Sequence, residues 1–122
     1  MKVIKISGVV VRGDGYGRKL GYPTVNLGGV TEAVTETLPP SGVYSGTASI
    51  MSRGILDTYR AGILINPEKE GKRKVEAHLI GYDGDAYGKV ITLKLEKFLR
   101  EYIKFENEQE LIAQIVEDLK KC

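Results

Sequence analysis

Hydrophobic and polar residues alternate over several short stretches of this chain. In the clearest one, Val75, Ala77 and Leu79 take every second position, with Glu76 and His78 between them. Successive side chains of a strand point to opposite faces, so the apolar set predicts a buried face and the polar set an outer face. β-Branched residues and alternation predict strands at Val3 to Val11, Gly42 to Met51, Thr58 to Ile65, Lys74 to Tyr82 and Lys89 to Phe98.

The hydrophobic pattern changes to helical spacing near the carboxyl end. Asn107 is placed to cap a helix, with Glu110 three residues later in the capping-box position. We therefore expect an amphipathic helix that lies on the sheet with its charged side in water. Its apolar positions are Leu111, Ile112, Ile115, Val116 and Leu119.

These elements predict a mainly β fold. Five or six short strands followed by one helix favour a closed antiparallel barrel, because closure removes exposed strand edges. At 122 residues the chain is long enough for one modest core. We expect a single domain over residues 1–122.

Composition and charge narrow the functional classes. The chain is 42% hydrophobic and 28% charged with a net charge of +2, which does not favour nucleic acid or a membrane surface as the main partner. Cys122 is the only cysteine, so an internal disulfide and a multi-cysteine zinc site are excluded. No signal peptide or membrane-spanning run is present, and a cytoplasmic monomer is the expectation.

The glycine-rich stretch from Arg12 to Asn26 is the first candidate for chemistry. Glycines let main-chain N–H groups approach a ligand closely, and with cations beside them these amides can bind polyphosphate. The alternative is a glycine-rich hairpin connection. No Walker sequence follows, and Arg18 stands where a dinucleotide fingerprint needs its third glycine. The candidate phosphate-binding residues here are Gly13, Gly15, Gly17, Arg18, Lys19 and Gly21.

The same stretch ends in a Pro-Thr-Val-Asn sequence. Pro23 biases Tyr22 toward extended geometry, so Thr24 and Asn26, two residues apart, are expected to point to the same side. A hydroxyl and a carboxamide directed together can bind Mg²⁺ through oxygen or hold a phosphate.

Motifs along nearly the whole chain resemble those of riboflavin kinases (flavokinases), in particular the kinase module of bifunctional flavin-synthesising enzymes. The resemblance implies a six-stranded Greek-key barrel with a C-terminal helix. It also implies transfer of the γ-phosphate of MgATP to the ribityl 5′-hydroxyl of riboflavin, giving FMN. The matching pieces are the glycine-rich loop, Pro23-Thr24-Val25-Asn26, Pro39-Pro40 with Gly42-Val43-Tyr44, Val75 to Leu79, Asp83 to Gly88, Phe98-Leu99-Arg100, and Phe105 leading into the final helix.

The resemblance also implies roles for single residues. Glu76 corresponds to the catalytic carboxylate, Thr24 and Asn26 to the metal and phosphate ligands, and Pro23 belongs to their motif. Flavin binding is expected from Glu76, Arg100 and Tyr87. Each of these roles has a structural alternative. Glu76 could be an exposed strand glutamate paired with a lysine, and Arg100 a surface cation paired with Glu101 or Glu106. The tyrosines could only fill the core. His78 shares the face of Glu76 but is left out of the catalytic set, as a structural hydrogen-bonding residue.

The chain departs from the family pattern after the strand that ends at Ile65. The family usually continues with Pro-Thr-Phe, whereas this chain has Asn66-Pro67-Glu68-Lys69, so the resemblance says least about the rim of the flavin pocket. No nucleotidyltransferase module precedes Met1, so FAD synthesis is not expected. A stand-alone kinase and half of a bifunctional enzyme remain open.

Two other functional classes remain open as well. A non-catalytic small barrel that binds nucleic acid or protein would need a basic strip interleaved with aromatics, but the cations here are mixed with acids apart from Lys72-Arg73-Lys74. A kinase of the same fold acting on another small alcohol is the third possibility, because fold alone does not determine substrate.

Overall fold

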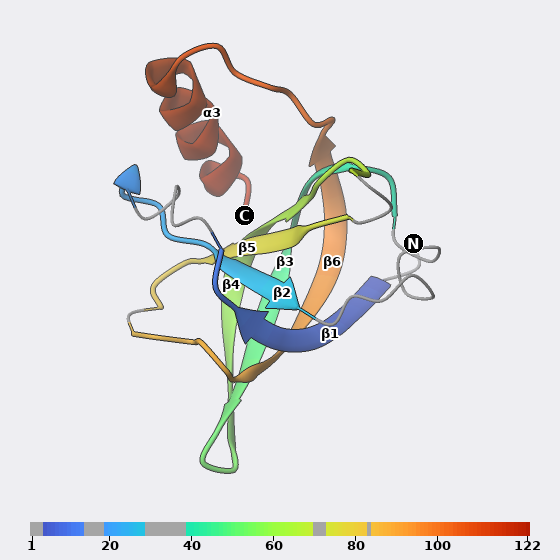
Figure 1. Ribbon diagram of the computed structural model, residues 1–122, viewed down its shortest axis with the longest axis vertical. Coiled ribbons are helices and arrows are strands. Elements are labelled where there is room, and N and C mark those ends of the chain that lie inside the picture. Colours follow the sequence, from blue (N-terminus) through green and yellow to red (C-terminus); the bar gives the residue numbers. More distant parts are fainter. Residues whose placement is uncertain (1–3, 14–18, 29–38, 70–72, 83) are drawn as a thin grey trace.

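Six strands form a ring in the computed structural model, and one helix stands over the upper end of that ring (Figure 1). The structure describes residues 4–13, 19–28, 39–69, 73–82 and 84–122. The elements in chain order are β1 (Ile4–Val11), β2 (Val25–Gly28), β3 (Gly42–Ser52), β4 (Ile55–Ile65), β5 (Val75–Leu79), β6 (Val90–Arg100) and α3 (Glu108–Lys120).

The strands close a barrel in the order β1-β2-β5-β4-β3-β6, and every neighbouring pair is antiparallel. The prediction of a closed antiparallel barrel followed by a C-terminal helix is therefore confirmed. The short strand β2 closes the ring between β1 and β5. Its position brings the Pro-Thr-Val-Asn sequence beside the strand that carries Glu76.

The barrel interior is filled by the apolar members of the alternating strands. The predicted apolar set on β5 is buried as expected, while Glu76 and His78 face outward, and on β6 the alternating Ile91, Leu93 and Leu95 are buried as well. Burying a side chain of this size contributes about 1.5–3 kcal/mol relative to exposure. The largest fully buried side chains are Ile63, Ile65, Val75, Ile91 and Leu93.

The hairpin of β3 and β4 is longer than the sequence predicted. The expected strands stop at Met51 and start again at Thr58, but the ladder continues to Ser52 and resumes at Ile55. Arg53 and Gly54 make the turn with φ of 52° and 76°, as a two-residue type I′ hairpin requires. Arginine rarely adopts positive φ, so the sequence carries no clear signal for this turn.

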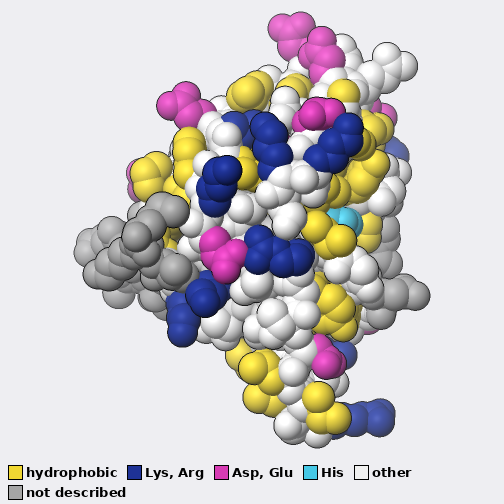
Figure 2. Space-filling view, turned by 180° about the vertical axis from the view of Figure 1, so that it is seen from behind, with side chains coloured by type: hydrophobic (Ala, Val, Ile, Leu, Met, Phe, Trp, Pro, Cys, Tyr) yellow, Lys and Arg dark blue, Asp and Glu magenta, His cyan; other side chains and the backbone are white. Residues whose placement is uncertain are grey.

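The tip of this hairpin projects beyond the barrel and exposes apolar side chains. Hydrophobic side chains gather at the lower end of the molecule, where the hairpin lies, while charges of both signs are mixed over the face above (Figure 2). The exposed apolar residues of the tip are Met51, Ile55 and Leu56.

Helix α3 begins as the capping-box pattern predicts. The Asn107 side chain accepts a hydrogen bond of 2.8 Å from the backbone N–H of Glu110. The apolar side chains of the helix are only half-buried, and Asp118 is its one buried residue. The helix thus covers the barrel without packing tightly on it. Among the described residues no helix has the length and apolar character needed to cross a bilayer.

Tyr44 belongs to the core. Its ring meets Phe98 edge to face, with 5.1 Å between centroids, and its hydroxyl donates to the Pro40 carbonyl oxygen at 2.8 Å. Burial raises the pKa of Tyr44, and the positive charge of Arg73 opposes the rise. Tyr44 therefore supplies core packing, the alternative raised for the tyrosines.

The backbones of β3 and β6 approach each other closely at Gly46. The ladder shifts register between Ser45 and Gly46, and a Cβ at Gly46 would overlap the Lys94 carbonyl oxygen. We expect Gly46→Ala to lower the free energy of unfolding by about 1–3 kcal/mol, because rigid backbone must move. Urea titration measures the change. Gly62→Ala is the control, since its Cβ would meet only side-chain atoms, the movable end of Leu119 at 3.3 Å and the Cys122 Sγ atom at 3.6 Å. Equal losses in both variants would contradict the prediction.

Candidate functional site

Two pockets adjoin β2 and meet at Thr24. The first has a volume of about 700 Å³ and lies beside the ends of β1 and β2, and the second, of about 470 Å³, lies between the barrel and α3. Within the described parts of the chain, Thr24 is the only residue that lines both. Any two ligands that occupied these pockets would therefore approach each other at this hydroxyl.

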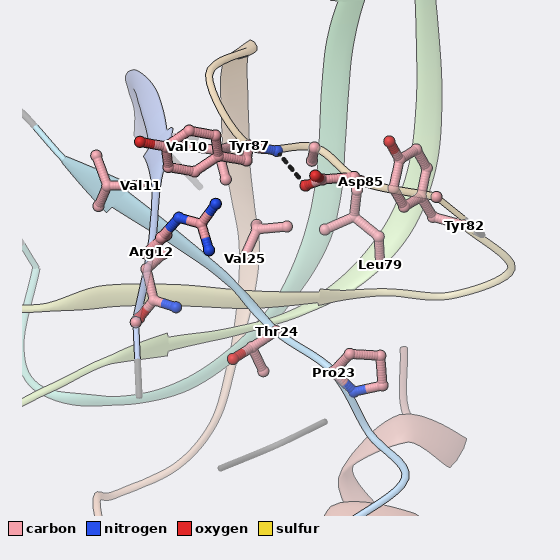
Figure 3. A pocket seen from close by; sticks show the side chains of 14 residues that line it. Val10, Val11, Arg12, Pro23, Thr24, Val25, Leu79, Tyr82, Asp85 and Tyr87 are labelled. Carbon is pink, nitrogen blue, oxygen red and sulfur yellow. Dashed lines mark hydrogen bonds between the residues drawn. The ribbon is translucent and has the colours of Figure 1, made fainter. Parts of the chain in front are cut away.

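The first pocket combines a cation with an aromatic face (Figure 3). The Arg12 guanidinium carbon lies 4.8 Å from the centroid of the Tyr87 ring, within the range of a cation–π contact. An Asp85 carboxylate oxygen accepts from the Tyr87 N–H at 2.9 Å and holds the turn that carries this ring. This pocket could therefore bind a planar group against the Tyr87 ring and an anion against the Arg12 guanidinium.

Gly13 lies in the same pocket, against the carboxamide of Asn26. An added Cβ at Gly13 would overlap the Asn26 Nδ2 atom and would lie 2.6 Å from its Cγ atom. Glycine at this position therefore allows the Asn26 carboxamide to lie close to the backbone just after β1, and a side chain here would displace the carboxamide.

The other residues of the expected phosphate loop fall into three groups. Pro23 and Thr24 line the first pocket together with Gly13 and Asn26. Lys19 is exposed and Gly21 has a φ of 90°, and neither residue lines either of these two pockets. Gly15, Gly17 and Arg18 lie outside the described part of the chain, and so does Asp83 of the Asp83 to Gly88 motif.

Glu76 lies beside Thr24 and Asn26. Its Cα pairs with that of Asn26 across the β2–β5 ladder. The Thr24 hydroxyl donates to Glu76 Oε1 at 3.4 Å, and the Asn66 amide donates to Oε2 at 2.9 Å. Three residues that sequence reasoning assigned to one site are thus brought together, although about 50 positions separate Glu76 from the other two.

The second pocket has an apolar wall and a few polar groups. Leu111 and Ile115 of α3 and Phe105 before it supply apolar surface, while Glu76 lies on the barrel side. A concave, mostly apolar site with a small number of polar groups is typical of small-molecule binding.

His78 fixes the chain next to Thr24. Its Nδ1 lies 2.7 Å from the Pro23 carbonyl oxygen, and its ring meets Tyr22 edge to face with 6.0 Å between centroids. A carbonyl only accepts hydrogen bonds, so the Nδ1 atom carries a proton in this contact. These contacts agree with a structural role for His78.

Arg100 ties the end of β6 to α3. Its Nε donates to both Asp118 carboxylate oxygens at 3.1 Å, and Nη2 donates to Oδ2 at 2.9 Å. Gln114 donates to the same carboxylate at 2.9 Å. The alternative of a surface Arg100 paired with the side chain of Glu101 or Glu106 is wrong, because Arg100 pairs with Asp118 and reaches only the backbone oxygen of Glu101. Asp118 was missed because only the docked helix brings it close.

Tyr87 does not lie with the other two expected flavin ligands. Glu76 and Arg100 both line the second pocket, whereas Tyr87 lies in the first, under the Arg12 guanidinium. Arg12 was not singled out by the sequence reasoning. Its place at the start of the glycine-rich stretch was the available signal.

The oxygen atoms near Thr24 suit a magnesium ion that takes most of its ligands from water and phosphate. Among the residues that the structure describes, no group of three His, Cys, Asp or Glu side chains could hold a metal. Mg²⁺ commonly takes only one or two protein ligands and completes its shell with water and phosphate oxygens. The Thr24 hydroxyl and the Asn26 carboxamide oxygen fit that requirement.

Comparisons with known proteins point to one family. The flavokinase (riboflavin kinase) family model matches residues 1–122. The chain is 34% identical over 123 residues to the riboflavin kinase of Mus musculus, covering 94% of this chain and 76% of that one. It is 32% identical over 117 residues to the bifunctional riboflavin kinase/FMN adenylyltransferase of Bacillus subtilis, and spans 35% of that protein's length. The crystal structure of riboflavin kinase from Trypanosoma brucei shares the fold, with a TM-score of 0.77 and 23% identity over 98% of this chain and 74% of that chain.

Breaking the Arg100–Asp118 ion pair should lower the free energy of unfolding. The two side chains are 18% and 8% exposed, so Asp118→Asn should leave a largely buried guanidinium without its counter-charge and lower the free energy of unfolding by roughly 3 kcal/mol. Glu96→Gln is the matched control, because Glu96 pairs with Arg60 at the surface, with exposures of 36% and 45%, where about 0–1 kcal/mol is expected. Chemical denaturation of both variants measures the difference. A loss at Asp118 no larger than that at Glu96 would refute the prediction.

Proposed function

This chain belongs to the riboflavin kinase family, and we propose that it transfers the γ-phosphate of ATP to the 5′-hydroxyl of riboflavin to give FMN. The observation that carries the proposal is the Glu76 carboxylate at the junction of two pockets, 3.4 Å from the hydroxyl of Thr24. A kinase must bring two substrates together at one point and position an alcohol there. We further propose that the protein acts as a monomer in the cytoplasm, where MgATP is available.

The nucleotide occupies the first pocket in this proposal. Arg12 stacked on Tyr87 offers a cation and a π surface, and the glycine-rich segment begins and ends beside the pocket with Gly13 and Pro23. The position of Tyr87 favours the nucleotide over the flavin as its ligand, which changes the assignment made from the sequence.

Riboflavin occupies the second pocket. The half-buried apolar face of α3 and the Phe105 ring provide surface for the isoalloxazine ring, and Glu76 lies at the end of the pocket that reaches Thr24. The ribityl chain then points toward the first pocket. Arg100 contributes by holding the wall of the pocket through Asp118, since its guanidinium already donates to that carboxylate.

The reaction needs positioning and charge neutralisation more than covalent help. The riboflavin 5′-oxygen bonds to the γ-phosphorus as the bridging bond between the β- and γ-phosphates breaks, and ADP leaves with that bond's electron pair. Glu76 orients the alcohol and accepts its proton as the new bond forms. Thr24 and Asn26 would hold Mg²⁺, which neutralises phosphate charge when bound.

Mixing the protein with riboflavin and MgATP and separating the products by chromatography tests the proposal. We expect FMN and ADP in equal amounts from the unchanged protein. Glu76→Gln should bind riboflavin with similar affinity but form FMN about 10²–10⁴-fold more slowly, because the proton acceptor is lost. Glu68→Gln, at an exposed glutamate outside both pockets, should keep normal turnover.

Three results would count against this proposal. Near-normal turnover by Glu76→Gln would remove Glu76 from the mechanism. Phosphorylation of a different small alcohol in place of riboflavin would keep the reaction class and change the substrate. No product, together with retention on single-stranded nucleic acid at physiological salt, would favour a binding barrel.

Thr24→Ala tests the metal and nucleotide assignment. Loss of one hard oxygen ligand should weaken binding of the magnesium nucleotide by about tenfold, while riboflavin affinity changes less. Isothermal titration calorimetry with a non-hydrolysable magnesium nucleotide measures the change. Thr92→Ala is the control, because Thr92 is an outer hydroxyl of β6 bonded to Ser7 and lines neither pocket. Unchanged nucleotide affinity in Thr24→Ala would contradict the ligand assignment.

A further inference from the structure

The side chain of Asn66 holds one oxygen of the Glu76 carboxylate. Asn66 follows the last residue of β4, and its Nδ2 atom donates to Glu76 Oε2 at 2.9 Å and to the Lys74 carbonyl oxygen at 3.0 Å. Glu76 is two residues beyond Lys74 on β5. The amide therefore bridges the backbone at the start of β5 and the carboxylate that projects from that strand.

The chemistry of the two partners determines which way the amide points. An ionised carboxylate and a backbone carbonyl both only accept hydrogen bonds, so the nitrogen of the amide must face them. Both N–H groups of Asn66 Nδ2 are then used. A carboxamide is the group that satisfies this arrangement, because a carboxylate at the same position would offer no donor.

The backbone of Asn66 is held as firmly as its side chain. Its N–H donates to the Lys74 carbonyl oxygen at 2.9 Å, and its carbonyl oxygen accepts from Arg73 Nε at 3.2 Å. The residue is half-buried. Asn66 is thus fixed at the start of the β4–β5 connection before any ligand arrives, and it can fix Glu76 in turn.

The two oxygens of Glu76 differ in their contacts. Oε2 accepts the 2.9 Å bond from Asn66, a charge-assisted hydrogen bond, whereas Oε1 has the longer 3.4 Å contact with Thr24. Oε1 is therefore the oxygen that lies toward the junction of the two pockets. A ligand hydroxyl can compete more easily for this weaker contact.

We propose that Asn66 is a positioning residue for the phosphoryl transfer. It holds Oε2, stops the carboxylate from rotating, and leaves Oε1 to receive the proton of the substrate hydroxyl. This inference rests on the proposed function, because it assigns Asn66 a role in the same reaction through Glu76.

Asn66→Ala tests the inference by steady-state kinetics. We expect kcat to fall about ten- to a hundredfold, the effect of one lost hydrogen bond to a charged group, while the KM values for riboflavin and MgATP change less than about threefold. Arg73→Ala is the matched control, since it loosens the same connection by releasing the Asn66 carbonyl oxygen and does not contact Glu76. Its kcat should stay within about threefold of the unchanged protein's. A similar fall in kcat for both variants would overturn the inference in favour of a merely structural role.

The same substitution in a Glu76→Gln background separates positioning from folding. If Asn66 acts through Glu76, Asn66→Ala should change the single-turnover rate by less than about threefold in that background. An equal fold loss in both backgrounds would overturn the inference. If Asn66→Ala does not fold in thermal melts, Asn66→Asp keeps the shape and the backbone hydrogen bonds. The repelling carboxylate should then lower kcat at least as much as expected for alanine, and normal kcat would contradict the role.

Failure of the inference and failure of the proposed function give different results. If the unchanged protein forms no FMN from riboflavin and MgATP, the proposed function fails and the role of Asn66 falls with it. If the unchanged protein is active and Asn66→Ala keeps its kcat, only the role of Asn66 is refuted.

Discussion

The candidate site depends on the pairing of β2 with β5. β2 has only four residues, yet it closes the barrel, and its register places Asn26 opposite Glu76. Side chains directly opposite each other on one face of an antiparallel pair lie close together, so this register determines which polar groups meet. A slip of one residue would turn Asn26 toward the barrel interior and separate it from Glu76. The pairing that closes the barrel therefore also brings the residues of the candidate site together.

The second pocket lies where α3 meets the barrel, and an ion pair helps to hold the helix there. The Arg100–Asp118 pair holds the helix near the end of β6, and the apolar side chains of the helix stay half-buried. A buried ion pair is a weak source of net stability but is sensitive to the loss of one partner. It holds the helix in place while leaving an apolar surface free beside Glu76. Tight hydrophobic packing of α3 would have filled the same space.

Hydrogen bonds to both oxygens of the Glu76 carboxylate orient it. Asn66 engages one oxygen from the β4 side, and Thr24 faces the other from the β2 side. His78, two residues further along β5, holds the Pro23 carbonyl oxygen and so holds Thr24 in place. The outer face of one strand thus organises both a charged group and the segment opposite it, which suits a reaction that depends on positioning.

Local patterns in the sequence determined the barrel, the capped helix and the core positions. Alternation on β5 and β6 and the capping box at Asn107 act over a few residues, so propensity and periodicity suffice to predict them. Family motifs also predicted Thr24, Asn26 and Glu76 as members of one site, and the structure places these three residues together. Only the tertiary structure revealed Asp118 as the partner of Arg100, Asn66 as the partner of Glu76 and the separation of Tyr87 from both. These contacts depend on strand register and on how a helix docks, and no local pattern encodes either.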